Sequence, residues 1–299
     1  MPRPWLLLAL AALVVGGCGS QPSSVTPSGA SASSGSTPVA GTALRAPSAS
    51  PRPVPSGDEL VVGVPDPSTQ GTDPDALTSL EGDTRSAIYW APLSDPSAVR
   101  SEGSVPSWRA WSTSKVLVVA AYLDTVVDGD PSRIPATERG WIAAALTRSD
   151  GDAVVDVRSR IPGSPGAAIT AVLRSIGDTT TTAADTAQGT MSWSPREQVR
   201  FMAALAAGRV VSPAASSFLL DQMQPISEHR WGLGRIGASS FKGGWLSSRT
   251  ETRQMGIVGG YAVAVITVGV GPAVLQTDGD YAHVHQMDRM AALLARRLE

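Results

Sequence analysis

Apolar and polar positions divide the chain into a middle part with helical spacing and a later part with strand spacing. Runs with a period of about 3.6 residues predict helices, one of which begins with Ser194 as N-cap and Pro195 at the first helical position. They cover residues 112–127, 136–147, 152–160, 167–176, 195–207, 213–223 and 284–298. Alternating or β-branched runs predict strands at residues 60–64, 86–90, 240–246, 253–258 and 261–270.

This order places strands near both ends of the folded region and helices between them, which predicts an α+β domain. Its antiparallel sheet is formed by the two chain ends and is flanked by helices. The apolar stretch 256–274 has nearly the length of a membrane span. Its glycines and β-branched residues, with Gly259-Gly260 at a hairpin turn, favour a buried β-hairpin instead.

The N-terminal region has the composition of an export signal. Arg3 precedes an apolar run, residues 5–15, which is too short to span a bilayer and is typical of a signal-peptide core. The only cysteine, Cys18, follows small residues as in a bacterial lipobox, where the thiol becomes lipidated. An ordinary secretory signal with a chance cysteine is the alternative.

Composition then divides the chain into three parts. We expect residues 1–17 to form a signal peptide with a lipobox, and residues 18–57 to carry the lipidated Cys18 and a disordered tether rich in Ser and Pro. Residues 58–299 form the folded domain. A lipid anchor would hold this domain at the extracytoplasmic face of a bacterial cell membrane.

Charge excludes some partners. The net charge is −2, and no basic run occurs, so we expect no nucleic-acid partner. The three histidines form no metal-binding motif, and we expect no metal ion or other cofactor, and a monomer.

Lysine is scarce. Among 24 Lys and Arg residues, only Lys115 and Lys242 are lysines. A codon bias against lysine explains the scarcity, but it does not explain these two positions. Unlike arginine, a desolvated lysine can lose its proton, so both positions are candidates for sites that need an ammonium and not a guanidinium.

Ser112-Thr113-Ser114-Lys115 opens a predicted apolar helix. This spacing puts Lys115 one turn from Ser112 on the same helix face. The partial positive charge of a helix N-terminus favours a developing alkoxide, and a buried, neutral lysine can accept the serine proton. A second match, Ser239 to Lys242, leads into a strand, where the lysine would not lie over its serine.

Two further motifs follow in order, Ser149-Asp150-Gly151 and Lys242-Gly243-Gly244. With the first, they resemble the S-x-x-K, S-D-N and K-[TS]-G motifs of the class A β-lactamase and penicillin-binding protein superfamily. The likeness covers residues 60–298 in order of elements, and both lysines of the chain fall in motif positions. It implies a β-lactamase/transpeptidase-like fold.

The resemblance also implies roles in the reaction. Ser112 would be the acylated nucleophile, Lys115 its base or proton relay, and Ser149 a proton shuttle to the leaving group. The backbone N–H groups of Ser112 and Trp245 would form the oxyanion hole.

Other residues would bind substrate. Lys242 would supply positive charge for a carboxylate, and Asp150 and Gly244 belong to the same binding motifs. Arg253, on the next strand, would be a carboxylate clamp or simply a surface arginine, and both interpretations stay open.

The departures from the family pattern concern substrate binding. Gly151 replaces an asparagine and Gly243 a hydroxyl-bearing residue, each a loss of about 1–3 kcal/mol of transition-state binding if nothing substitutes. Only 37 positions separate Ser112 from Ser149, fewer than in a typical class A enzyme, so the all-helical subdomain should be trimmed.

The loop at residues 179–194 departs in another way. It contains Asp185 as its only acid and lacks the Glu-x-x-x-Asn with which class A β-lactamases activate the deacylating water. Glu197 lies just beyond the loop, and we expect it to be a charge on a helix surface.

These observations favour a β-lactamase-like serine hydrolase that is acylated on Ser112 by β-lactams, esters or cell-wall peptides, with slow or absent β-lactam turnover. The alternative is a non-catalytic envelope lipoprotein that keeps the fold as a binding or scaffolding module. The retained Ser112–Lys115 pair favours the enzyme. A transpeptidase would need an open groove, which sequence does not show.

Overall fold

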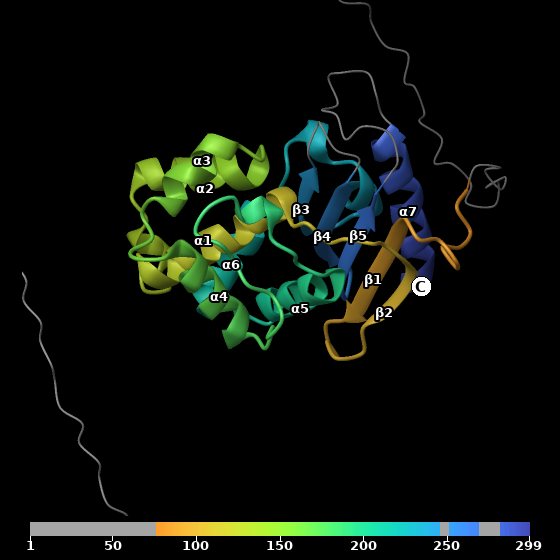
Figure 1. The fold of residues 1–299 in the computed structure, drawn as a ribbon, viewed down its shortest axis with the longest axis horizontal. Helices are drawn as coiled ribbons and strands as arrows, with labels where there is room; N and C mark the ends of the chain where they lie inside the picture. Colours follow the sequence, from red (N-terminus) through yellow and green to blue (C-terminus); the bar gives the residue numbers. More distant parts are fainter. Residues whose placement is uncertain (1–75, 246–250, 269–281) are drawn as a thin grey trace, which may run out of the picture. The chain divides into compact units, whose positions relative to one another are not determined.

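A five-stranded antiparallel sheet is built from both ends of the folded region (Figure 1). The computed structural model describes residues 76–245, 251–268 and 282–299, and the predicted strand 60–64 lies outside them. The strands are β1 (Ser86–Pro92), β2 (Arg100–Ser104), β3 (Ser240–Trp245), β4 (Thr252–Val258) and β5 (Tyr261–Thr267). Their order is β2-β1-β5-β4-β3, so the early hairpin pairs with the last strand. This topology confirms the predicted α+β fold.

The helices lie within a few residues of their predicted positions. They are α1 (Ser114–Thr125), α2 (Ala136–Thr147), α3 (Gly151–Arg158), α4 (Pro165–Ser175), α5 (Pro195–Ala206), α6 (Pro213–Gln222) and α7 (Ala282–Leu298). The Ser-Pro signals explain this agreement. Ser164, Ser194 and Ser212 each accept the backbone N–H three residues on, and proline occupies the first helical position.

Strand β2 is the element that sequence patterning does not predict. Its five residues, Arg-Ser-Glu-Gly-Ser, are exposed or half-buried and have no apolar alternation. It forms because its backbone pairs with β1, from Ser86 opposite Ser104 to Trp90 opposite Arg100. Tertiary pairing therefore overrides weak strand propensity here.

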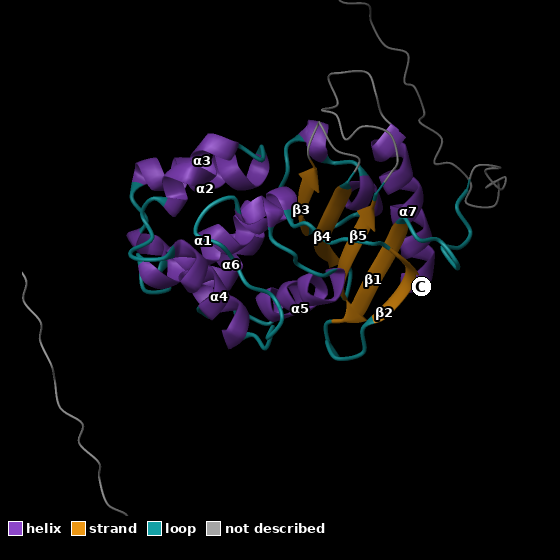
Figure 2. Ribbon diagram, viewed as in Figure 1, coloured by secondary structure: helices purple, strands orange, loops and turns teal. Residues whose placement is uncertain are grey.

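The two faces of the sheet carry separate apolar cores. Alternate residues of β1 and β5, such as Ile88 and Val265, pack with the buried face of α7. The opposite residues, including Ala91 and Ala264, pack with α5 and α1. Figure 2 shows α1–α4 and α6 gathered on one side of the sheet and α7 on the other. The core shared with α5 and α1 joins the sheet to α1, at whose start the Ser112–Lys115 motif lies.

The apolar stretch 256–274 forms the β4–β5 hairpin in its described part, as predicted. In the part of the chain that the structure describes, no helix has both the length and the apolar character needed to cross a bilayer.

Packing on α5 yields a stability prediction. Phe201 is fully buried and stacks edge-on against Trp193, with 5.5 Å between ring centroids. Phe201→Ala should lower the free energy of unfolding by about 3–5 kcal/mol, measured by urea denaturation, because it leaves a cavity in this core. Val155→Ala, at a residue that is 44% exposed, is the control and should change it by less than about 0.5 kcal/mol. Equal losses for the two variants would contradict this assignment of the core.

Candidate active site

Ser112 lies at the start of α1, the helix that runs through the core shared with α5. A short 3-10 turn, Trp111–Thr113, leads directly into α1 and leaves Ser112 half-buried. The Nζ atom of Lys115 donates a hydrogen bond of 2.7 Å to the Oγ atom of Ser112. The predicted serine–lysine pair is therefore formed, with the two side chains in direct contact.

Backbone geometry holds Ser112 at this position. Trp111, directly before it, has a φ of 44°, a left-handed conformation that a bulky residue rarely adopts. Its indole Nε1 donates to Oε2 of Glu251 over 2.9 Å, and its carbonyl accepts the Ser114 hydroxyl over 2.7 Å. These bonds offset the local strain, which is a feature often found beside reactive side chains.

Burial changes the charge preference of Lys115. The side chain lies inside the protein, and this desolvation lowers the pKa of its ammonium to about 8, opposed by the negative charge of Asp150. Near neutral pH a useful fraction is then neutral, and a neutral amine can accept a proton. Asp150 itself caps α3, since its Oδ1 accepts the Ala153 N–H over 3.0 Å.

The second and third motifs meet each other beside this pair. The Nζ atom of Lys242 donates to Oγ of Ser149 and, over 2.8 Å, to the carbonyl of Gly243. Burial and the positive charge of Lys115 hold the pKa of Lys242 well below its usual range. The three motifs lie close together, because Lys242 contacts Ser149 and Gly244 lies against the backbone nitrogen of Ser112. Ser149 has a φ of 61°, a second left-handed residue in the site.

Strand β3 passes directly against the start of α1. A Cβ atom on Gly244 would lie 2.9 Å from the Ser112 nitrogen and 3.0 Å from the Ala110 oxygen, so only glycine permits this approach. The next residue, Trp245, is half-buried and lines the same cleft as Ser112. Gly244 therefore sets how closely the backbone at Trp245 can approach the nucleophile.

The glycines that depart from the family motifs have different surroundings. A Cβ atom on Gly243 would lie 3.0 Å from the Trp245 ring, so this ring occupies space beside the residue. A Cβ atom on Gly151 would meet nothing within 4 Å. At residue 243 the Trp245 ring occupies part of the space that a side chain would fill. At residue 151 that space is open.

Arg253 is fully buried, so the interpretation as a surface arginine is wrong. It pairs with Gly244 across β3 and β4, which places its side chain on the face of the sheet toward Ser112. Within the described residues, none of its guanidinium nitrogens has a hydrogen-bond partner. Burial lowers the pKa of this guanidinium to about 9, opposed by Glu251. A buried, unpaired cation is costly, and an anion near the site would relieve that cost.

A cleft of about 210 Å³ opens over Ser112 and Lys115. Its walls include residues that sequence reasoning did not select: Trp111, Ser114, Val118, Val154, Arg158, Ala187, Gln188 and Gly189. Arg158 ends α3, and its Nη1 donates to Oε1 of Gln188 over 3.0 Å. Gln188 is buried in the loop 179–194. Its place in this loop, which carries the deacylation glutamate in class A β-lactamases, is the sequence feature that could have singled it out.

That loop is fixed beneath the 3-10 turn by the main chain. The Ala110 N–H donates to the Met191 carbonyl, and the Trp193 N–H donates to the Trp108 carbonyl, both over 2.9 Å. No Asp or Glu is among the residues that line the described cleft.

Glu197 does not lie on the helix surface as predicted. It is buried and pairs with Arg200 over 2.8 Å, and desolvation raises its pKa, with a further contribution from Asp178. The α5 N-terminus turns inward here, which places its first turn in the protein interior. Glu197 does not line the cleft.

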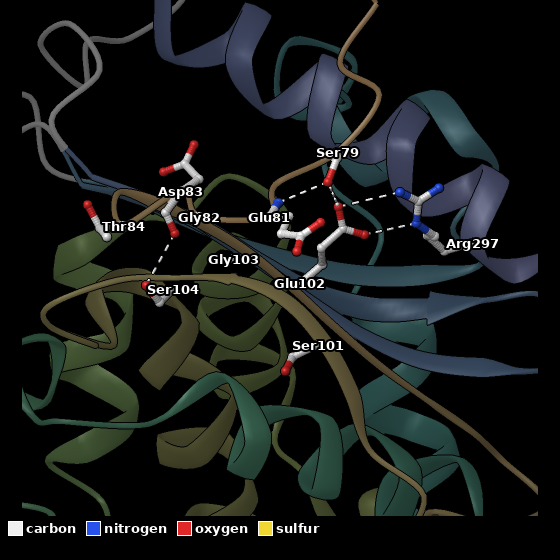
Figure 3. A pocket seen from close by; sticks show the side chains of 10 residues that line it. All are labelled: Ser79, Glu81, Gly82, Asp83, Thr84, Ser101, Glu102, Gly103, Ser104 and Arg297. Carbon is white, nitrogen blue, oxygen red and sulfur yellow. Dashed lines mark hydrogen bonds and ion pairs between the residues drawn. The ribbon is translucent and has the colours of Figure 1, made fainter.

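A larger cavity, of about 580 Å³, lies at the β2 edge of the sheet. Figure 3 shows its carboxylate Glu102 between Ser79 and Arg297. These bonds lower the pKa of Glu102, Arg297 contributing most. The cavity contains no lysine next to a serine, so the smaller cleft at Ser112 is the candidate active site.

Solved structures of similar fold include the chromosome-encoded β-lactamase of Vibrio parahaemolyticus, with a TM-score of 0.55 at 16% identity, over 72% of this chain and 94% of that one. PBP-A gives 0.53 at 19% identity, over 74% and 93%. The TLA-3 extended-spectrum β-lactamase gives 0.53 at 14% identity, over 71% and 92%. No family model and no curated protein sequence matches the chain. At these identities the likeness shows the fold, which is β-lactamase-like.

The lowered pKa of Lys115 predicts a dependence of stability on pH. Between about pH 8 and pH 10.5 the folded protein holds a neutral Lys115, while the unfolded chain holds a charged one. The unfolded state then binds more protons, so the free energy of unfolding should rise with pH across this window. Lys115→Met should remove that part of the rise, measured by urea denaturation at several pH values. Parallel pH profiles of the two proteins would contradict a lowered pKa.

Proposed function

We propose that the chain is a serine hydrolase of the β-lactamase-like fold, in which Ser112 is acylated by an amide or ester substrate such as a β-lactam or a cell-wall peptide. The observation that carries the proposal is the 2.7 Å hydrogen bond between Lys115 Nζ and Ser112 Oγ, at a lysine that is buried and titrates near pH 8. A serine becomes a useful nucleophile when a neighbouring base can take its proton.

In the acylation step, neutral Lys115 accepts the hydroxyl proton as Ser112 Oγ bonds to the substrate carbonyl carbon. The developing oxyanion would be stabilised by the N–H groups of Ser112 and Trp245. The contact of Gly244 with the backbone at Ser112 supports this, because it brings β3 next to the start of α1.

The leaving group then needs a proton. Ser149 would donate it as the carbonyl carbon separates from the leaving nitrogen or oxygen, and Lys242, which contacts Ser149, would replace it. Burial disfavours a charge on Lys115 and on Lys242 at the same time. A proton would therefore pass between Lys115 and the Lys242–Ser149 pair at little cost.

Substrate binding would use the remaining motif residues. Arg253 and Lys242 would attract a substrate carboxylate through their positive charge, without direct contact, because both side chains are buried and neither is among the described residues that line the cleft. Asp150 would act by fixing the start of α3 and so the position of Ser149. Gly151 and Gly243 contribute no polar side chain, and this weakens substrate binding relative to the family motifs.

Hydrolysis of the acyl-enzyme would be slow. The cleft is lined by Gln188 where a glutamate would be needed to activate water, and none of the described residues that line it carries a carboxylate. A neutral amide cannot remove a proton from water, so we expect a long-lived acyl-enzyme with β-lactams.

A non-catalytic role is less favoured, since such a protein gains nothing from a buried lysine bonded to an accessible serine. Burial of the lysine is costly, and a methionine of similar shape would avoid that cost.

Acylation can be tested with a fluorescent penicillin and intact-mass measurement. The wild-type protein should gain one penicillin on Ser112, and the rate should rise with pH through about 8 as Lys115 loses its proton. The adduct should persist for many minutes after free reagent is removed.

Two variants serve as controls for that experiment. Ser112→Ala should form no adduct, and Lys115→Arg should react at least about a hundredfold more slowly, because arginine keeps its proton. If the wild-type protein forms no Ser112-dependent adduct with any β-lactam or activated ester, the proposed activity is wrong.

We further propose that Cys18 is lipidated and anchors the domain to the outer face of the cell membrane. The support is the small-residue sequence before the only cysteine. In a bacterial host, the wild-type protein should sediment with membranes and gain mass at its N-terminal peptide, and Cys18→Ser should do neither. Equal membrane association of both proteins would contradict the anchor.

A further inference from the structure

The candidate active-site cleft contains a fixed cation that the proposed reaction does not use. Arg158 is half-buried at the end of α3 and lines the same cleft as Ser112 and Lys115. It is distinct from the motif residues and from Arg253, which is fully buried and does not line the cleft.

The charge of Arg158 is not neutralised by an acid. In the described part of the chain its guanidinium makes one hydrogen bond, to the neutral side-chain oxygen of Gln188, and no ion pair. The nearby Arg160, in contrast, forms an ion pair with Glu138 over 3.2 Å. A guanidinium carries five N–H donors, so donors remain for a ligand.

Gln188 holds this guanidinium in place. Its Nε2 donates to the carbonyls of Ala184 and Asp185, over 3.0 and 2.8 Å, which fixes its Oε1 toward Arg158. An arginine whose position is set in this way loses little further entropy when it binds a ligand.

The rest of the cleft favours an anion on an apolar stem. Trp111, Val118, Val154 and Trp245 provide an apolar wall, and the described lining residues include no Asp or Glu. A carboxylate that reaches Arg158 would therefore gain a charge-assisted hydrogen bond with no acid competing for it.

We propose that Arg158 forms a subsite for a carboxylate on the acyl side of the substrate, so that the preferred acyl donors carry an acidic side chain. This inference rests on the proposed function, because it assigns a substrate class to the same cleft. The subsite is separate from Arg253 and Lys242, which would attract a carboxylate at the other end of the substrate.

Three penicillins test the subsite because they differ at one carbon of the acyl side chain. Carbenicillin carries a carboxylate there, benzylpenicillin a hydrogen and ampicillin an ammonium group. Their non-covalent affinities are measured by calorimetry with the Ser112→Ala protein, which cannot be acylated. We expect carbenicillin to bind about tenfold or more tightly than benzylpenicillin, and ampicillin to bind most weakly.

Variants then assign the preference to Arg158. In the Ser112→Ala background, Arg158→Gln should abolish the preference for carbenicillin, while Arg158→Lys should keep part of it. Arg289→Gln is the matched control, because Arg289 is an exposed arginine on α7 and does not line the cleft. It should keep the whole preference.

The outcomes separate the two proposals. Equal affinities for carbenicillin and benzylpenicillin, including no measurable binding of either, overturn the subsite, as does a preference that survives Arg158→Gln. Acylation of wild-type protein by the same compounds is measured in parallel. Absence of a Ser112 adduct together with an Arg158-dependent preference would overturn the hydrolase and leave the subsite standing.

Discussion

The close approach of β3 to the start of α1 is the constraint on which the rest of the site depends. Gly244 lies against the Ser112 nitrogen, where any side chain would collide with backbone that has no room to move. This contact joins the sheet to the central helix. It also brings Lys242 to Ser149, although the two residues lie far apart in the sequence. The chemistry of the site thus follows from a packing contact.

Burial of two lysines has one physical consequence that neither would have alone. Each is desolvated, and the positive charge of Lys115 lowers the pKa of Lys242 further. The cluster therefore resists holding two extra protons at once, and in the proposed reaction a proton taken from Ser112 would be passed on. The negative charge of Asp150, which caps α3 nearby, opposes the lowering of the pKa of Lys115. In the proposed reaction the two lysines would therefore differ in their tendency to accept a proton.

Sequence patterning predicts most of this fold because the Ser-Pro caps and the apolar runs are local signals. Strand β2 has neither, and its formation depends on pairing with β1, which local patterns do not encode. The motif positions could likewise be predicted from the sequence, since it contains only two lysines and both fall in motif positions. Arg158 and Gln188 were not, because an arginine on a short helix and a glutamine in a loop are ordinary until the fold places them together. The burial of Arg253 and Glu197 depends on strand and helix packing and was missed for the same reason.

If Ser112 is acylated as proposed, the loop that carries Gln188 gives a physical reason for slow hydrolysis of the acyl-enzyme. Its main chain is tied to residues 108–110 on one side, and its side chain is bonded to Arg158 on the other. A glutamate at this position would be drawn toward the guanidinium and would form an ion pair with it, which would lower its basicity. Restoring a general base would therefore require removing Arg158 as well as replacing Gln188. The pairing of an uncharged amide with a free guanidinium favours binding of an anion over activation of water.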